Sequence, residues 1–298
     1  MKNFWIRLCS SVTLVLIAFV TIIKGGELLA VVLLLISLIA YRELLKAFKL
    51  TDAVKKWSFC SLELVGHGAI IIYYLVMYDL LADNKFPLFK IIIKDHLLLL
   101  LILVIALIIF MAIYVFTFPK YHIRQIMEAF FSIIYAPVML SCIYMIREGL
   151  AGGGYFVWVI FICSWVCDSC AYCVGMLFGH HKLVPTLSPQ KSLEGSLGGI
   201  LGAMIVGALY SGLFVGKDFP EMKYFTLIIA ICCGIGAVVS QIGDLAASAI
   251  KRNYELKDFG KLIPGHGGIM DRFDSVIFTA PFICIVLYII DMKLSNLM

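Results

Sequence analysis

Charged residues are scarce in this sequence. Only 14% of the 298 residues are Asp, Glu, Lys or Arg, whereas a typical soluble domain carries about 25%. The mean hydropathy is +1.03, and no polar segment long enough for a soluble domain separates the apolar runs. Because runs of about 20 apolar residues cross a bilayer as helices, the sequence predicts an all-α polytopic integral membrane protein.

Motifs typical of several other protein classes are absent as well. The ten cysteines lie mostly within apolar runs and form no secreted-type disulfide framework. The chain has neither a Walker A loop nor a G-x-G-x-x-G motif behind a strand. No small-residue cleavage site precedes Lys24, so we expect residues 1–23 to be a retained span rather than a signal peptide. The net charge of +5 is spread over loops, which favours anionic lipid headgroups over nucleic acid as partners.

The apolar runs predict about nine transmembrane helices. They cover residues 1–23, 27–46, 59–82, 96–118, 125–146, 153–178, 196–215, 223–250 and 273–291. Because 16 of the 24 Lys and Arg residues lie on the side of the N-terminus, the positive-inside rule places that side in the cytosol. We expect N-terminal helices with few chemical motifs over 1–150 and C-terminal helices with the catalytic loops over 151–298, together forming one integrated membrane domain.

The densest charge lies in the stretch 248–275, between the last two predicted spans. Five cationic residues alternate there with three aspartates around a Pro-Gly-His-Gly-Gly turn. They are Lys251, Arg252, Lys257, Asp258, Lys261, Asp271, Arg272 and Asp274. Carboxylates bind Mg²⁺, and cations and glycine amides bind phosphate. The stretch therefore indicates a site that handles a charged phosphate ester with a metal ion.

Two further aspartates, Asp168 and Asp244, lie inside apolar segments, where a carboxylate usually faces a cavity or a partner. Helical spacing places four residues on one face: Asp244, Ser248, Lys251 and Arg252. Asp271 and Asp274 would share a face at the start of the last span. A helix cap explains one of these two. With Asp244 they make three carboxylates that converge where two helices meet, and these would repel one another unless a cation lies between them.

Other polar features have simpler interpretations. Four cysteines near Asp168 form overlapping C-x-x-C units within one helical run, whereas structural zinc sites draw on two separated elements, so zinc is disfavoured. Ser188-Pro189 is expected to begin a turn, with Lys191, Ser192 and Glu194 near the start of the next span, where free amides favour anions. Tyr41-Arg42-Glu43 is expected to anchor the second span at the interface with a charge pair.

The polar stretch resembles the signature of the phosphatidate cytidylyltransferases, or CDP-diacylglycerol synthases, S-x-[apolar]-K-R-x4-K-D-x-G-x2-[apolar]-P-G-H-G-G-x-x-D-R-x-D-S. All its fixed positions are met: Ser248, Lys251, Arg252, Lys257, Asp258, Gly260, Pro264, Gly265, His266, Gly267, Gly268, Asp271, Arg272, Asp274 and Ser275. Three upstream elements are also similar to the family's, namely D-[ST]-x-A-Y-x-x-G at 168–175, S-P-x-K-[ST]-x-E-G at 188–195 and G-D-L at 243–245. The resemblance is strong over 164–275.

The resemblance implies condensation of CTP with phosphatidic acid to CDP-diacylglycerol and pyrophosphate, for phospholipid biosynthesis, in a helical membrane fold with a polar cytosol-facing cavity. It implies Mg²⁺, with or without a second cation such as K⁺, held by Asp244, Asp271 and Asp274. These aspartates, Lys251 and His266 would form the catalytic set. Substrate and phosphate binding falls to Asp168, Ser188, Lys191, Ser192, Ser248, Arg252, Lys257, Gly267, Gly268 and Arg272.

Two positions depart from the family pattern. Gln190 stands where Lys is frequent, and Ala247 stands where Glu is frequent. These changes leave open how strongly the first loop binds phosphate and whether one carboxylate is missing.

Two alternatives remain at this stage. A membrane cation transporter would use Asp168 and Asp244 along an ion path, although the polar groups cluster towards one face. A CTP-dependent enzyme acting on another lipid would share the nucleotide site, whereas the D-G-x-x-A-R motif of CDP-alcohol phosphotransferases is missing. By family analogy, the short chain favours a bacterial inner membrane. The sequence does not indicate the acyl-chain preference, the preference between CTP and dCTP, the cytosine-binding residues or whether the protein forms a homodimer.

Overall fold

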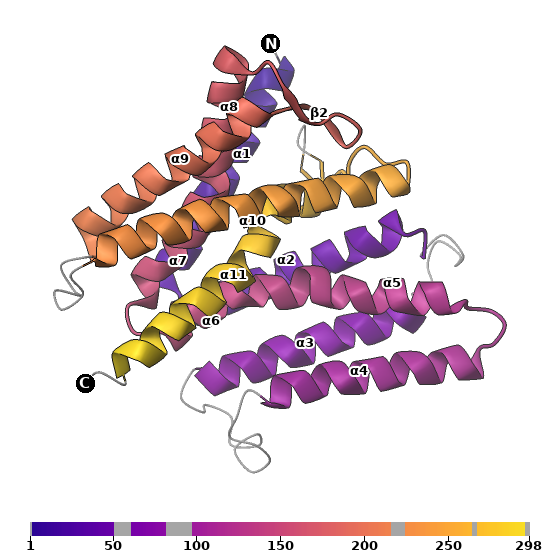
Figure 1. Cartoon of the computed structure of the whole chain (residues 1–298). Helices are drawn as coiled ribbons and strands as arrows, with labels where there is room; N and C mark the ends of the chain where they lie inside the picture. Colours follow the sequence, from indigo (N-terminus) through magenta and orange to yellow (C-terminus); the bar gives the residue numbers. More distant parts are fainter. Residues whose placement is uncertain (1, 51–60, 82–96, 216–223, 264–266, 296–298) are drawn as a thin grey trace. The chain divides into compact units, whose positions relative to one another are not determined.

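The structure, a computed structural model, describes residues 2–50, 61–81, 97–215, 224–263 and 267–295 (Figure 1). The chain forms two compact units. Unit 1 comprises Met1–Tyr144 and Leu256–Arg272, and unit 2 comprises Met145–Glu255 and Phe273–Met298. The polar loop after residue 255 therefore belongs to unit 1, although the helix before it belongs to unit 2.

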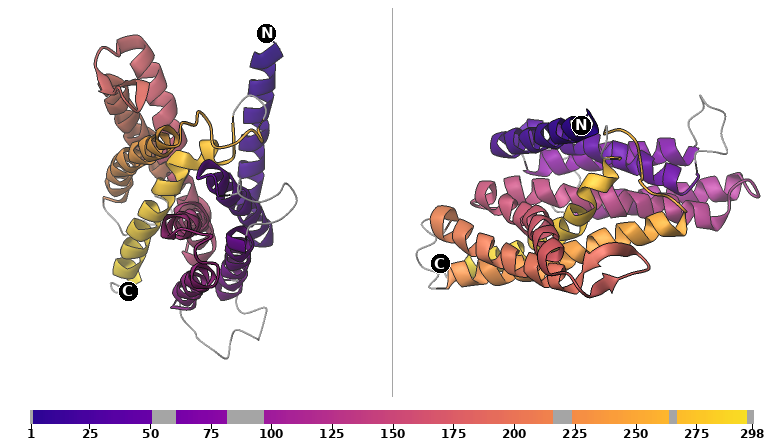
Figure 2. Two further views of the ribbon diagram at one scale, coloured as in Figure 1. Left: turned by 90° about the vertical axis from the view of Figure 1, so that its right-hand side faces the viewer. Right: turned by 90° about the horizontal axis from the view of Figure 1, so that it is seen from above.

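Unit 1 is built from the N-terminal helices. They are α1 (Lys2–Lys24), α2 (Gly26–Ala47), α3 (Ser61–Leu81), α4 (Leu97–Phe116), α5 (Ile123–Ile133), the π-helix η1 (Ile134–Val138) and the first part of α6 (Met139–Gly149). Helix α3 lies beside both α2 and α4 (Figures 1 and 2). Inside this unit the buried Tyr74 hydroxyl lies 2.7 Å from Ser37 Oγ and donates to the Pro137 carbonyl at 3.0 Å. Both contacts satisfy polar groups that have no access to water.

Unit 2 holds the remaining elements. They are the end of α6, α7 (Gly153–Phe161), the π-helix η2 (Ile162–Val166), α8 (Cys167–Phe178), β1 (Lys182–Val184), β2 (Ser188–Ser192), α9 (Leu193–Tyr210), the π-helix η3 (Ser211–Val215), α10 (Phe225–Asn253) and most of α11 (Met270–Ser295). Gly152 separates α6 from α7 with a φ of 74°, a left-handed conformation that glycine adopts without steric cost.

Small residues let the helices of unit 2 approach closely. Helix α9 lies alongside both α8 and α10 (Figures 1 and 2). A Cβ at Gly199 would lie 2.8 Å from the Cys167 carbonyl oxygen, and one at Gly207 would lie 2.9 Å from Cys233 Cβ. Such small-residue contacts are the usual basis of helix association in membranes. The cysteines here thus pack as small apolar side chains, and both are free thiols.

The predicted fold class is confirmed. Eight helices in the described part of the chain are long and apolar enough to cross a membrane, and α1 adds a shorter apolar helix over Val12–Lys24. Large aliphatic side chains are exposed along them, for example Leu201 at 58% and Ile205 at 60% on α9. Lipid contact explains this exposure, which water would penalise.

The turn predicted at Ser188-Pro189 is wrong by three residues. The turn occupies 185–187, and Ser188 already begins β2, which pairs antiparallel with β1 in the register Lys182↔Ser192 and Val184↔Ser188. Pro189 lacks an N–H, but a two-stranded sheet leaves each strand one free edge where this is tolerated. The span predicted over 153–178 is confirmed as Gly153–Phe178, and it contains the π-helix η2, which ends two residues before Asp168.

Candidate active site

The β-hairpin carries Lys191 towards helix α10. Lys191 Nζ forms an ion pair with Asp244 Oδ2, and both side chains are partly buried. Next to it, Ser192 is the N-cap of α9, because its Oγ accepts a hydrogen bond from the Gly195 N–H at 3.1 Å. This cap satisfies one of the free amides at the start of the helix. The predicted position of both residues near the start of that span is confirmed.

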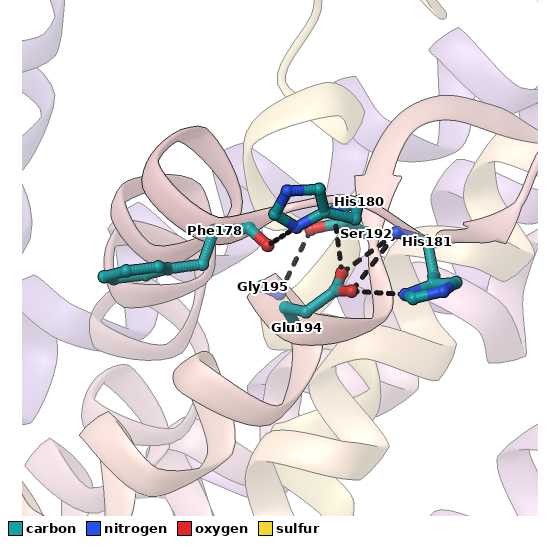
Figure 3. Close-up of polar contacts among 6 residues, drawn as sticks. All are labelled: Phe178, His180, His181, Ser192, Glu194 and Gly195. Carbon is teal, nitrogen blue, oxygen red and sulfur yellow. Dashed lines mark hydrogen bonds and ion pairs between the residues drawn. The ribbon is translucent and has the colours of Figure 1, made fainter.

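Glu194 fixes the base of the hairpin. Figure 3 shows its carboxylate accepting hydrogen bonds from the backbone N–H groups of His180 and His181, each at 3.2 Å. His181 Nδ1 lies 2.6 Å from Glu194 Oε1. These contacts hold the segment after α8 against the first turn of α9, and they thereby hold the strand that carries Lys191.

A cavity of about 720 Å³ lies in unit 2, beside this hairpin. Its polar lining is Asp168, Tyr172, Lys182, Ser188, Gln190, Lys191, Ser192, Ser196, Gln241 and Asp244. The expectation that Asp168 faces a cavity is confirmed. Gln241 is held in place because its Nε2 donates to the Ser196 carbonyl at 3.0 Å, while the Ser196 hydroxyl donates to its Oε1.

Acidic and basic side chains meet at this cavity, which Asp168 and Asp244 line together with Lys182 and Lys191. Asp168, Asp244 and Asp274 repel one another, although Asp274 is not a lining residue, and Lys191 and Lys251 offset part of this repulsion. No three His, Cys, Asp or Glu side chains converge into a preformed metal site in the part of the chain that the structure describes. The repulsion among the three aspartates and their oxygen donors nevertheless fit a hard cation such as Mg²⁺.

Helix α10 presents the predicted polar face. Asp244, Ser248 and Lys251 are partly buried along it, and Arg252 is exposed in the last turn. Gly243 lets α11 approach, because a Cβ there would lie 2.9 Å from the Asp274 carbonyl oxygen. The absence of a side chain at this position therefore keeps Asp244 beside the segment that bears Asp274.

In unit 1, Asp271 organises the polar loop. The residue is buried, and its Oδ2 accepts hydrogen bonds from the backbone N–H groups of Phe259 at 2.9 Å and Gly268 at 3.0 Å. Ile263 N–H donates to the Gly267 carbonyl at 2.9 Å. Gly267 has a φ of 90°, a conformation that favours glycine. One carboxylate oxygen thus joins the two ends of the loop.

The other predicted residues are placed as follows. Arg252, Lys257 and Arg272 are exposed, Gly268 is buried and Gly267 is half-buried. Three positions of the signature, Pro264, Gly265 and His266, lie outside the described residues. Asp244 and Asp274 belong to unit 2 and Asp271 to unit 1, so a metal site shared by all three stays a prediction.

Glu43 is the residue that sequence reasoning missed. The predicted charge pair of Arg42 and Glu43 is wrong, because Arg42 Nε pairs with Glu63 Oε1 of α3 at 3.1 Å. Glu43 is 6% exposed and accepts hydrogen bonds from the backbone N–H groups of Ile269 and Met270 at 3.1 and 2.8 Å. The available signal was an acidic residue at the end of an apolar helix.

Several known proteins are similar to this chain in sequence. A phosphatidate cytidylyltransferase of Staphylococcus aureus is 30% identical over 289 residues, which cover 95% of this chain and 98% of that protein. One of Staphylococcus saprophyticus is 40% identical over 157 residues, 52% of this chain and 56% of that protein. One of Bacillus subtilis is 36% identical over 132 residues, 44% and 47% of the two chains. Residues 5–290 match the cytidylyltransferase family. The chain therefore belongs to that family.

Proposed function

We propose that this protein transfers the cytidylyl group of CTP to phosphatidic acid and so forms CDP-diacylglycerol and pyrophosphate. The observation that carries the proposal is the cavity in unit 2, where the Lys191–Asp244 ion pair and Asp168 line one space. All three residues lie in segments that match the family's motifs. Staphylococcal relatives named phosphatidate cytidylyltransferase support the same substrates.

The chemistry requires two polyanions to approach each other. A phosphate oxygen of phosphatidic acid attacks the α-phosphorus of CTP, the new P–O bond forms, and the bond to the leaving pyrophosphate breaks. Lys191 at the cavity and Lys251 on α10 would offset phosphate charge. Three exposed cations, Arg252, Lys257 and Arg272, are also assigned to phosphate binding. Orientation and charge stabilisation account for catalysis, because the attacking phosphate is already ionised and needs no dedicated base. We assign His266 to phosphate binding.

Mg²⁺ is the proposed cofactor. Asp244 and Asp274 would hold it, and Asp271 is the third proposed ligand. A bound divalent ion supplies charge stabilisation for the leaving pyrophosphate. The repulsion among Asp168, Asp244 and Asp274 supports a cation at this position. A second cation such as K⁺ would find oxygen donors of the same kind there.

Lipid selectivity tests the proposed function. Purified protein in detergent, with CTP and Mg²⁺, is expected to give CDP-diacylglycerol when dioleoyl phosphatidic acid is added, as detected by mass spectrometry. Dioleoylglycerol or a polyprenol is expected to give no product, because neither carries the attacking phosphate. Formation of polyprenyl phosphate instead would contradict the proposal and favour a CTP-dependent kinase.

We further propose that the protein lies in a bacterial inner membrane with the catalytic loops in the cytosol. In a cysteine-depleted background, Lys257→Cys is expected to react with a membrane-impermeant maleimide only from the cytosolic side. Both Lys257 and Lys24 are exposed, and Lys24 is the last residue of α1. Lys24→Cys is therefore the matched control, expected to react only from outside. Labelling of each cysteine from the opposite side would mean that the catalytic loops face outward, where cytosolic CTP could not reach them.

A further inference from the structure

The first turn of α11 begins inside the family signature and needs hydrogen-bond acceptors. The first N–H groups of any helix lack partners within the helix. In α11 the earliest of these belong to Ile269, which precedes the helix, and Met270, its first residue. Both are buried, at 7% and 0% exposure, so water does not satisfy them. A buried N–H group without a partner costs stability, and this start of the helix therefore requires an acceptor.

Glu43, from helix α2, supplies that acceptor. Its Oε1 accepts the Ile269 N–H at 3.1 Å, and its Oε2 accepts the Met270 N–H at 2.8 Å. The two carboxylate oxygens thus cap α11 from another helix. A carboxylate is the preferred partner there, because hydrogen bonds to ionised groups are stronger and the helix dipole favours negative charge at its N-terminus.

Two glycines of the loop make room for this carboxylate. A Cβ at Gly260 would lie 2.7 Å from the carboxylate carbon of Glu43, and a Cβ at Gly268 would lie 2.6 Å from it. Both distances are shorter than van der Waals contact. Neither glycine has a positive φ, so the contact with Glu43, rather than backbone conformation, explains why side chains are excluded there.

Glu43 and Asp271 act on the same loop from two directions. Asp271 Oδ2 accepts the N–H groups of Phe259 and Gly268, whereas Glu43 accepts the next two along the chain. The two buried carboxylates repel each other. The hydrogen bonds from the backbone amides offset this repulsion and hold both carboxylates in place. Four backbone N–H groups together fix the loop and the first turn of α11.

We propose that Glu43 is a positioning residue for cytidylyl transfer. Its hydrogen bonds go to the backbone of the signature, and they set where α11 begins. The inference rests on the proposed function, because Asp271, Arg272 and Asp274 all follow within the next turn and a half of that helix. Displacing the start of α11 would displace their side chains, and a misplacement of about 1 Å in a reacting geometry costs on the order of 10²-fold in rate.

Glu43→Gln is the principal test. The amide keeps the size of the side chain but can offer only one acceptor oxygen to two N–H groups. We expect kcat at saturating CTP to fall at least ~10-fold, with KM for phosphatidic acid nearly unchanged, since Glu43 positions the helix rather than the lipid. Hydrogen exchange at the Ile269 and Met270 amides is expected to accelerate in the same variant, in the absence of substrate.

Glu63→Gln is the matched control. Glu63 is also a buried carboxylate of unit 1, at 4% exposure, but the structure pairs it with Arg42. Its replacement is expected to leave exchange at Ile269 and Met270 unchanged and kcat within about threefold of wild type, a free-energy change well under 1 kcal/mol. Equal losses in both variants would overturn the inference, because they would reflect a general effect of neutralising a buried carboxylate.

A double-mutant cycle keeps the inference falsifiable if Glu43→Gln does not fold. Gly260→Ala is expected to lower kcat because its Cβ meets the Glu43 carboxylate, and the shorter side chain of Glu43→Asp makes room for it. The penalty of Gly260→Ala should therefore be smaller in the Glu43→Asp background, by at least ~5-fold. Additive effects would overturn the inference. If the wild-type protein were inactive on phosphatidic acid, the proposed function would be refuted. The hydrogen-exchange measurement would still test whether Glu43 caps α11.

Discussion

Chelation with EDTA is expected to abolish CDP-diacylglycerol formation, and added Mg²⁺ is expected to restore it. The reason is the mutual repulsion of Asp168, Asp244 and Asp274 in unit 2. Two further polyanions must enter this space during the reaction. Without a divalent cation the repulsion would oppose both substrate binding and the departure of pyrophosphate. The measurement is initial rate against free Mg²⁺, with CTP and phosphatidic acid saturating.

The control is Ca²⁺ added at equal concentration after EDTA. Ca²⁺ accepts more ligands at longer distances than Mg²⁺, so it is expected to restore activity poorly. Full activity in excess EDTA would contradict the assignment of a divalent cofactor, and the carboxylates would then serve only as partners of the lysines.

Asp244→Asn and Asp274→Asn are expected to lower kcat at least ~10²-fold, equivalent to ~2.7 kcal/mol. Asn keeps the size of the side chain and one oxygen but removes the charge that would hold the cation. In Asp244→Asn the ion pair with Lys191 is lost as well. The measurement is turnover at saturating CTP, in protein shown to be folded by size-exclusion chromatography.

Asp258→Asn is the matched control for these two variants. Asp258 is exposed in the loop beside Lys257, so its replacement is expected to raise KM for CTP while leaving kcat close to wild type. Added Mg²⁺ is not expected to reverse that change. If Asp244→Asn or Asp274→Asn keeps more than about a third of wild-type kcat at low Mg²⁺, a cost well under 1 kcal/mol, that residue does not hold the metal.

The membrane helices could be predicted because their signal is local. An uninterrupted apolar run of about 20 residues satisfies its backbone only as a helix in lipid, and α2, α4 and α9 lie within a few residues of their predicted ranges. The hairpin is a different case. Its strands are short and polar, and their pairing depends on Glu194 holding the backbone of His180 and His181, which no periodicity reveals.

The site could be predicted in part. Asp168 and Asp244 stand out because charge is costly in apolar helices. Lys191 stands out in the polar loop before a span, and the structure brings all three residues to one cavity. Glu43 carries a similar signal as an acidic residue at the end of an apolar helix, but its partner could not be recognised, since Ile269 lies 226 residues away in the chain. The partners of Glu43 are backbone N–H groups, which every residue except proline carries. The sequence therefore does not show which residues Glu43 contacts.

The fate of each phosphate of CTP tests the central claim most directly. Wild-type protein is incubated with phosphatidic acid and Mg²⁺, and with CTP that carries ³²P at either the α- or the γ-phosphate. We predict that the α-label enters the lipid fraction as CDP-diacylglycerol, and that the γ-label appears in pyrophosphate only when phosphatidic acid is present. Transfer of the γ-label to lipid, or release of labelled pyrophosphate without phosphatidic acid, would contradict cytidylyl transfer to this lipid.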